Sequence, residues 1–510
     1  MDFWIRAAQL VLSLSILVVL HEFGHYIPAK IFKTRVEKFY LFFNPWFSLF
    51  KKKVGDTEWG IGWLPLGGYV KIAGMVDESM DKEQLALPPQ PWEFRSKKAW
   101  QRLIIMIGGV TVNLILGILI YIFVVFAYGV ETIDCKDLKA GLAVHPYMEQ
   151  FGIKSGDVLL EVEGKPLNKA TDGTAELLLR GAHKVKVQHP DGKIQNIVLP
   201  ADIDYKLFEN GAFPVFSLRM KAEKIDHLIA VEEFAEQNLD LKSGDIIYKI
   251  NNITTDKIED LNKLIESKTQ TEVVSIREKD TIKGKISSKI FTKKVLPVIP
   301  ALVAGLKKGD KFLTINDSEI VYHDQIQAEM YKNKGKKVTF TVLRNNQKVE
   351  LSSVVSKSGL LGFLPEEMKA IDKSAIKTTY YSFGESIQRG WNMGFITLGD
   401  YTGQLKFLFT KKGATSVGGF GSIGKMFPTT WNWQIFWMNT AFISIVLAFM
   451  NILPIPALDG GHVVFLIYEI ITGKEAPQKV LEYAQYVGFM LLLGLLIYAN
   501  GNDIYSAFFK

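Results

Sequence analysis

The stretch HEFGH, residues 21–25, holds the residue types of a metal centre. His21 and His25 are four residues apart, so on a helix their imidazoles share one face and can bind one ion. Glu22 can then accept a proton from a water molecule on that ion. The pattern is typical of Zn²⁺, which takes three protein ligands in a catalytic site. The alternative is a chance match, or a histidine pair bonded to backbone carbonyls.

The element that must position HEFGH is a long apolar segment, because residues 5–20 are mostly apolar. Four segments have about the twenty residues needed to cross a bilayer, and they cover residues 3–24, 103–128, 435–455 and 480–499. Gly108, Gly109 and Asn113 in the second segment suit a helix packed against other helices. Ionisable groups in such segments are functional as a rule. The sequence therefore predicts a multi-span α-helical membrane protein with about four transmembrane helices.

The third apolar segment ends in NILPIPALDGGH, residues 451–462. Pro454 and Pro456 must break the helix, and irregular backbone at membrane depth is tolerated only where it is buried in protein or lines a wet cavity. Asp459 follows at once, and we predict it as the third zinc ligand, ahead of the competing His462.

The loop between the first two spans is rich in lysine and arginine, which predicts that it lies in the cytoplasm. The N-terminus and the region from about 130 to 430 are then outside, and HEFGH and the end of the third span reach a similar depth on the cytoplasmic side. The acidic, arginine-poor N-terminus predicts a retained helix and not a cleaved signal peptide. The chain of 510 residues has a formal charge of +7 and one cysteine, Cys135, which excludes an intrachain disulfide. We find no nucleic-acid module and expect no nucleic-acid partner.

HEFGH and NILPIPALDGG together resemble the site-2 protease family of intramembrane zinc proteases, in particular its bacterial branch, the regulators of sigma-E proteases. The resemblance implies a zinc metalloendopeptidase in which His21, His25 and Asp459 hold Zn²⁺ and Glu22 is the general base. Asn451 would hold the substrate backbone or the developing oxyanion; an ordinary packing amide is the alternative.

The resemblance also implies a place and a class of substrate. The protein would lie in the bacterial inner membrane as a multi-pass protein in contact with the lipid bilayer. Its substrates would be membrane proteins with a single transmembrane segment, already trimmed of their outer domain, such as an anti-sigma factor or a signal-peptide remnant. Its cut would be the second one in regulated intramembrane proteolysis.

Residues 36–72 are aromatic and β-prone, with a turn expected at Gly55-Asp56 and a last strand after Gly67-Gly68. This loop resembles the family's membrane-associated β-hairpin. An edge strand that includes Gly67, Gly68, Tyr69 and Val70 would pair with an unwound substrate helix. The alternative is an interfacial anchor with its tryptophans at the lipid headgroups.

Three passages of the outer region share one pattern: FGIKSGDVLLEVEGKPL, LDLKSGDIIYKINNITT and AGLKKGDKFLTINDSEI. They start at residues 151, 239 and 304 and resemble PDZ domains, which in the family act as a size filter over the active site. The middle copy lacks the small residues that usually precede the Lys-x-Gly-Asp pattern, so we treat it as degenerate or inserted. Residues 382–409 are amphipathic, and we expect a pair of interfacial helices there.

These features divide the chain into six parts. They are an N-terminal membrane half (1–130), three extracytoplasmic PDZ-like copies (131–211, 212–290 and 291–360), a part with the amphipathic interfacial helices (361–430) and a C-terminal membrane half (431–510).

Two other functions compete with the protease. One is a non-catalytic PDZ membrane scaffold that binds envelope proteins; a structural zinc site there has no need of Glu22. The other is a zinc transporter, which needs polar residues along several spans, and the second and fourth spans offer few.

Overall fold

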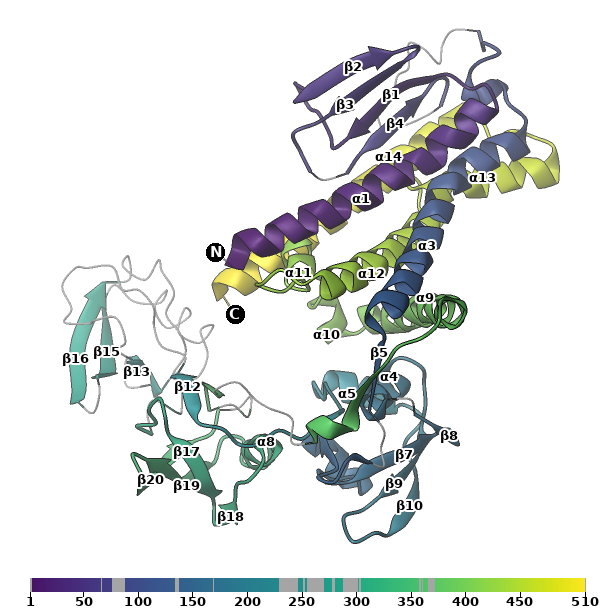
Figure 1. The fold of residues 1–510 in the computed structure, drawn as a ribbon. Coiled ribbons are helices and arrows are strands. Elements are labelled where there is room, and N and C mark those ends of the chain that lie inside the picture. The colour runs from purple at the N-terminus through teal and green to yellow at the C-terminus, as the bar shows by residue number, and fades with distance from the viewer. Residues whose placement is uncertain are drawn as a thin grey trace. The chain divides into compact units, whose positions relative to one another are not determined.

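The computed structural model describes residues 2–65, 67–75, 88–133, 137–167, 169–228, 246–250, 253–254, 270–277, 280–287, 301, 304–356, 359, 361–365 and 372–509. The chain forms two compact units (Figure 1). The first unit comprises residues 1–130 and 379–504, and the second comprises residues 131–378 and 505–510. Both membrane halves of the sequence therefore belong to the first unit.

Four helices of the described residues are long and apolar enough to cross a membrane, as the sequence predicts. They are α1 (Asp2–Ile31), α3 (Ala99–Tyr128), α12 (Trp433–Ile452) and α14 (Gln478–Phe509). The central one is α3, which packs against α1, α12 and α13 (Asp459–Thr472). Because α1 continues to Ile31, HEFGH lies inside the helix and not at its end.

Residues 382–409 form one long helix, α9 (Phe383–Leu405), followed by the 3-10 turn η7 (Lys406–Phe409). Ser382 caps α9, since its hydroxyl accepts from the amide of Glu385 while the Glu385 carboxylate accepts from the amide of Ser382. The helix packs along α3, where Gly390 lies against Ile122. It is not among the four helices with the composition of a span. Short helices α10 (Lys411–Ala414) and α11 (Phe420–Gly424) lead on to α12.

A four-stranded sheet follows α1, in the order β2-β3-β1-β4 (Figure 1). Its strands are β1 (Val36–Leu41), β2 (Phe50–Val54), β3 (Thr57–Ile61) and β4 (Tyr69–Ile72), and η1 (Phe94–Ser96) precedes α3. The turn at Gly55-Asp56, where Gly55 has φ 61°, and the strand after Gly67-Gly68 are as predicted. β1 pairs in parallel with β3 and antiparallel with β4, so β2 and β4 are the two edges. Phe39 of this sheet packs on Phe23 of α1, with ring centroids 4.8 Å apart.

The second unit contains three four-stranded sheets that share the same strand order when the first is read in reverse. The orders are β10-β9-β7-β8, β14-β13-β15-β16 and β18-β17-β19-β20. In each sheet the pairing of the first strand with the third shifts register at the same place, after Leu159, Ile247 and Phe312. The described strands of the middle copy thus form a sheet with the same strand order as those of the other two copies. The strands are β7 (Val158–Val162), β8 (Lys165–Pro166), β9 (Lys184–Gln188), β10 (Ile194–Val198), β13 (Ile246–Ile250), β14 (Ile253–Thr254), β15 (Gln270–Arg277), β16 (Asp280–Ser287), β17 (Lys311–Ile315), β18 (Ser318–Glu319), β19 (Lys337–Arg344) and β20 (Gln347–Val354).

The repeated Gly-Asp has a structural reason. Asp310 is fully buried, and its carboxylate accepts from the amide of Lys307 at 2.8 Å and from the guanidinium of Arg344 at 2.6 and 2.7 Å. Asp157 is also buried and accepts from the amide of Lys154 at 2.8 Å. The aspartate therefore closes the turn before the first strand in the first and last copies.

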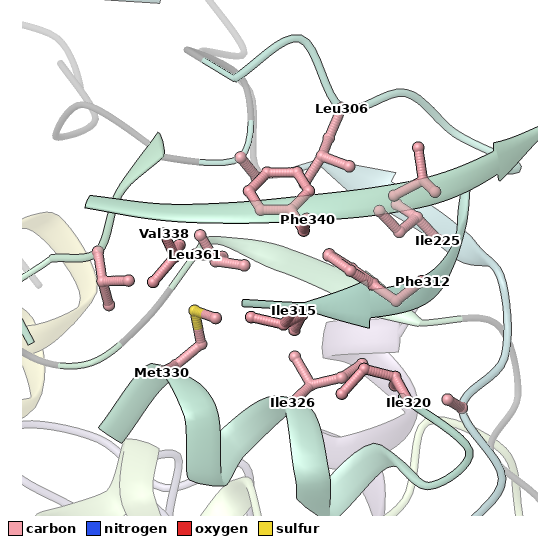
Figure 2. Close-up of a cluster of buried hydrophobic side chains, with 14 residues drawn as sticks. Ile225, Leu306, Phe312, Ile315, Ile320, Ile326, Met330, Val338, Phe340 and Leu361 are labelled. Atoms are coloured by element: carbon pink, nitrogen blue, oxygen red, sulfur yellow. The ribbon is translucent and has the colours of Figure 1, made fainter. Parts of the chain in front are cut away.

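The last copy has a core of its own (Figure 2). Ile326 and Met330 of α8 (His323–Lys332) pack beneath Phe312 and Phe340 of the sheet. Ile225 joins this core, and its strand β12 (Ile225–Leu228) pairs with β21 (Phe363–Pro365). The last copy thus includes Ile225, which lies within the residues 212–290 predicted for the middle copy. The domain boundaries given above stay a prediction.

Further elements complete the described part of the chain. They are β5 (Val130–Ile133), β6 (Leu142–Val144), η3 (Pro146–Phe151), η4 (Ala170–Asp172), α4 (Gly173–Leu178), α5 (Ile203–Glu209), β11 (Phe216–Leu218), η6 (Lys373–Ala375) and β22 (Ile376–Thr379). β11 pairs with β6, so it belongs with the first copy.

Candidate active site

Three side chains from opposite ends of the chain converge in the first unit. The Nε2 atoms of His21 and His25 are 3.3 Å apart, and each lies 3.4 Å from Oδ2 of Asp459. This Oδ2 is buried and has no hydrogen-bond partner in the part of the chain that the structure describes. A buried carboxylate oxygen needs a donor or a cation. The three atoms could hold a metal ion.

The spacing of these atoms suits zinc. Ligand atoms bound tetrahedrally at about 2.0–2.2 Å lie about 3.3–3.5 Å from one another. Two imidazoles and one carboxylate are also a donor set that zinc accepts. His462, the competing third ligand, lies outside this cluster and lines a neighbouring cavity of about 200 Å³. The residues present therefore fit a zinc ion.

Glycines let α1 and α3 approach closely at the histidines. A Cβ atom on Gly24 would lie 2.4 Å from the carbonyl oxygen of Gly108, so the two backbones are in contact. A Cβ atom on Gly109 would lie 2.3 Å from Nε2 of His25 and 2.6 Å from Cε1 of His21. The space that the imidazoles occupy thus exists because residue 109 has no side chain.

Asp459 is placed by the break after α12. The helix ends at Ile452, as the prolines predict, and Asp459 is the first residue of α13. Gly460 allows this sharp turn, because a Cβ atom there would lie 2.2 Å from the carbonyl oxygen of Leu453. The amide of Ala457, which has φ 79°, donates to Gln485 of α14 at 3.2 Å. The loop is therefore hydrogen-bonded to α14.

Asn451 and Glu22 lie beside the three candidate ligands. Asn451 lies in the last turn of α12, with Nδ2 3.5 Å from Nε2 of His21. Glu22 is 8% exposed. Beside it lies Gly68 of the loop, where a Cβ atom would be 3.5 Å from Cγ of Glu22 and 2.6 Å from Cγ1 of Val18. The segment before β4 therefore touches the face of α1 that carries Glu22.

The other predicted hairpin residues extend away from this contact. Gly67 has φ 146° and lies against the ring of Phe43. The Tyr69 hydroxyl donates to Asn44 at 3.0 Å, within the same loop. Val70 packs on the hydrophobic cluster between α1 and α3. Gly68 is thus next to Glu22, as pairing of the edge strand with a substrate beside HEFGH requires.

A family model described as peptidase family M50 matches residues 9–495. The chain belongs to peptidase family M50. It is similar to the "Regulator of sigma E protease" of Haemophilus influenzae, with 26% identity over 99% of both chains. It is similar also to a "Putative zinc metalloprotease" of Xylella fastidiosa, with 25% identity over 99% of both chains, and to "Protease RseP" of Yersinia pestis, with 25% identity over 98% of both.

Membership of the M50 family confirms the resemblance to the site-2 proteases. The protein is a zinc metalloprotease and, with its four apolar helices, a multi-pass membrane protein. Family membership therefore favours the protease over the two alternatives, the non-catalytic scaffold and the zinc transporter.

The sequence did not predict the contribution of α3 to this M50 site. The carbonyl oxygen of Ile105 lies 2.8 Å from Nδ1 of His25, and the Asn113 amide lies 3.2 Å from Nδ1 of His21. Asn113 was assigned only to helix packing. The signal that could have found it is a lone buried amide in an apolar span, eight residues from Ile105 on the same helix face.

Proposed function

We propose that the protein cuts peptide bonds within the transmembrane segments of membrane proteins, with His21, His25 and Asp459 as the zinc ligands. The observation that carries this proposal is the convergence of three ligand atoms, within 3.4 Å of one another, inside a bundle of apolar helices. The bound zinc supplies a water molecule of lowered pKa as the nucleophile and a Lewis acid for the carbonyl.

In this proposal Glu22 is the general base. It follows His21 directly in α1, which keeps it close to the candidate ligands. It is also buried from solvent. Asn451 offers an amide donor 3.5 Å from Nε2 of His21, where it can hold the substrate backbone or the oxyanion.

The sheet after α1 supplies a place for the opened substrate. A peptide bond inside a helix is shielded, so the substrate must unwind before it is attacked. β4 is an edge strand, and Gly68 leads from Glu22 directly into it. Backbone groups at Gly67, Gly68, Tyr69 and Val70 can therefore pair with an extended substrate segment beside the base.

The distribution of charge supports the orientation of this site. The basic loop between α1 and α3 favours the cytoplasmic side of a bacterial inner membrane for the sheet and the ligands, with the PDZ-like copies outside. Those copies would restrict access to single-span proteins already trimmed of their outer domain. An anti-sigma factor or a signal-peptide remnant would fit this description, and the cut would be the second one in regulated intramembrane proteolysis.

The experiment compares wild type, Glu22→Gln and Glu482→Gln with a fluorescent single-span substrate that lacks an outer domain. Glu482, on α14, contacts Gln478 and serves as a matched control for the loss of one carboxylate. We expect one zinc per chain in all three proteins, and a fall of kcat/KM by about 10²–10⁴ in Glu22→Gln alone. Equal cleavage by Glu22→Gln and wild type would refute the role of Glu22. Wild type without zinc would refute the site.

A further inference from the structure

One stripe of α3 faces both histidines. Ile105, Gly109 and Asn113 follow one another at intervals of four, so they share one face of the helix. The Ile105 carbonyl meets Nδ1 of His25, the Asn113 amide meets Nδ1 of His21, and Gly109 leaves room between them. α3 thus contacts the nitrogen of each ring that points away from Asp459.

The contact at His25 defines its tautomer. A backbone carbonyl only accepts hydrogen bonds, so Nδ1 of His25 must carry the proton. Its Nε2 then presents a lone pair toward Asp459, as a metal ligand requires. At His21 the Gly109 backbone also hydrogen-bonds the ring, and the Asn113 side-chain amide, which can either donate or accept, lies at Nδ1.

We propose that Asn113 is a positioning residue for His21, whose amide oxygen accepts the proton on Nδ1 and so keeps the Nε2 lone pair for the metal. This inference rests on the proposed zinc site. As the side chain stands, Nδ2 faces the ring, and Oδ1 is buried without a hydrogen-bond partner in the described residues. A half turn of the amide places the oxygen 3.2 Å from Nδ1 with almost no change in shape.

The surroundings hold Asn113 in this place. Its side chain is 1% exposed, and its own carbonyl accepts from the hydroxyl of Ser444 on α12 at 2.7 Å. Because the side-chain amide is buried, it has no water to bond, and its partner among the described residues is His21. A carbonyl-type acceptor on the outer nitrogen also makes a ligating imidazole more basic and fixes its ring plane.

The test compares Asn113→Leu, Asn113→Asp and Thr440→Val in the full-length protein. Leucine keeps the volume and removes both amide atoms, whereas aspartate keeps an acceptor and removes the donor. Thr440 is the matched control, because its hydroxyl is also fully buried in the bundle but bonds to Ser13 and Phe436. Zinc affinity is measured by competition with a chelator, the visible spectrum of the Co²⁺-loaded protein reports ligand geometry, and thermal unfolding in detergent checks folding.

We expect Asn113→Leu to lose about 10- to 100-fold in zinc affinity and to change the Co²⁺ spectrum. Thr440→Val and Asn113→Asp should stay within a few-fold of wild type. Wild-type zinc affinity and spectrum in a folded Asn113→Leu protein would overturn the inference. A folded Asn113→Asp protein as weak as the leucine variant would show that the amide donates, which also overturns it. Wild type that binds no zinc would instead count against the proposed function.

Discussion

Replacing Gly109 by alanine tests whether α3 sets the positions of the two histidines. The new methyl carbon would lie 2.3 Å from Nε2 of His25 and 2.6 Å from Cε1 of His21, whereas ordinary contacts begin at 3.4 Å. The rings or the helices must therefore move by about 1 Å, several times the ~0.2 Å that a metal site tolerates. Displacements of this size cost about 100-fold, so we expect zinc affinity and kcat/KM to fall by at least that factor.

The matched control is Gly494→Ala on α14, where a Cβ atom meets nothing within 4 Å. Both substitutions raise helix propensity by about 1 kcal/mol, so a difference between them comes from the contact alone. Zinc is titrated against a chelator, cleavage is followed on the trimmed fluorescent substrate, and thermal unfolding is recorded in detergent. A Gly109→Ala protein that binds zinc as tightly as wild type would refute the reasoning, because the histidines would then not depend on the space at residue 109.

Three further predictions concern other parts of the chain. Gly68→Val should lower kcat/KM and leave the zinc content unchanged, because its side chain would force the loop away from α1; loss of zinc in a folded variant would contradict this. Asp310→Ala should destabilise the last copy of the second unit by about 3 kcal/mol in denaturant unfolding, since it leaves Arg344 without its buried partner. Burial and the nearby Lys334 lower the pKa of His145 from 6.5 to about 4. The folded state therefore favours neutral His145. Its contribution to the free energy of unfolding is complete above pH 6.5 and is lost as the pH falls toward 4. His145→Gln should make unfolding of the second unit less dependent on pH in this range, and an unchanged pH profile would contradict the assignment.

The elements that carry the ligands could be predicted because their signals are local. A run of about twenty apolar residues identifies a span, and a spacing of four identifies one helix face. The meeting of HEFGH with Asp459 was expected from topology, since the basic loop predicts that HEFGH and the end of α12 lie at a similar depth on the same side of the bilayer. The distances of 3.4 Å agree with that expectation.

Other parts of the fold could not be predicted from such signals. The sequence predicts strands within residues 36–72 but not that β1 lies parallel to β3, because alternation shows which face is buried and not which strand is the neighbour. α13 was not predicted as a separate helix, because its 14 residues are too few to span a bilayer. Ile225 joins the core of the last copy although strands β13 to β16 lie between them in the sequence, and such a contact has no local pattern.

The role of α3 was the hardest to predict, because none of its contributions comes from a side chain whose type alone indicates a metal site. Ile105 contributes a backbone carbonyl, Gly109 contributes empty space, and Asn113 contributes one amide in a span where an amide usually packs against a neighbouring helix. The pattern becomes visible only when Gly24 is placed against Gly108, because the two helices then run in opposite directions past the same two rings. Two histidines four residues apart on one helix thus find their outer hydrogen-bond partners eight residues apart on the other. In a helical metal site, a glycine midway between two polar partners on the facing helix is therefore the feature to look for.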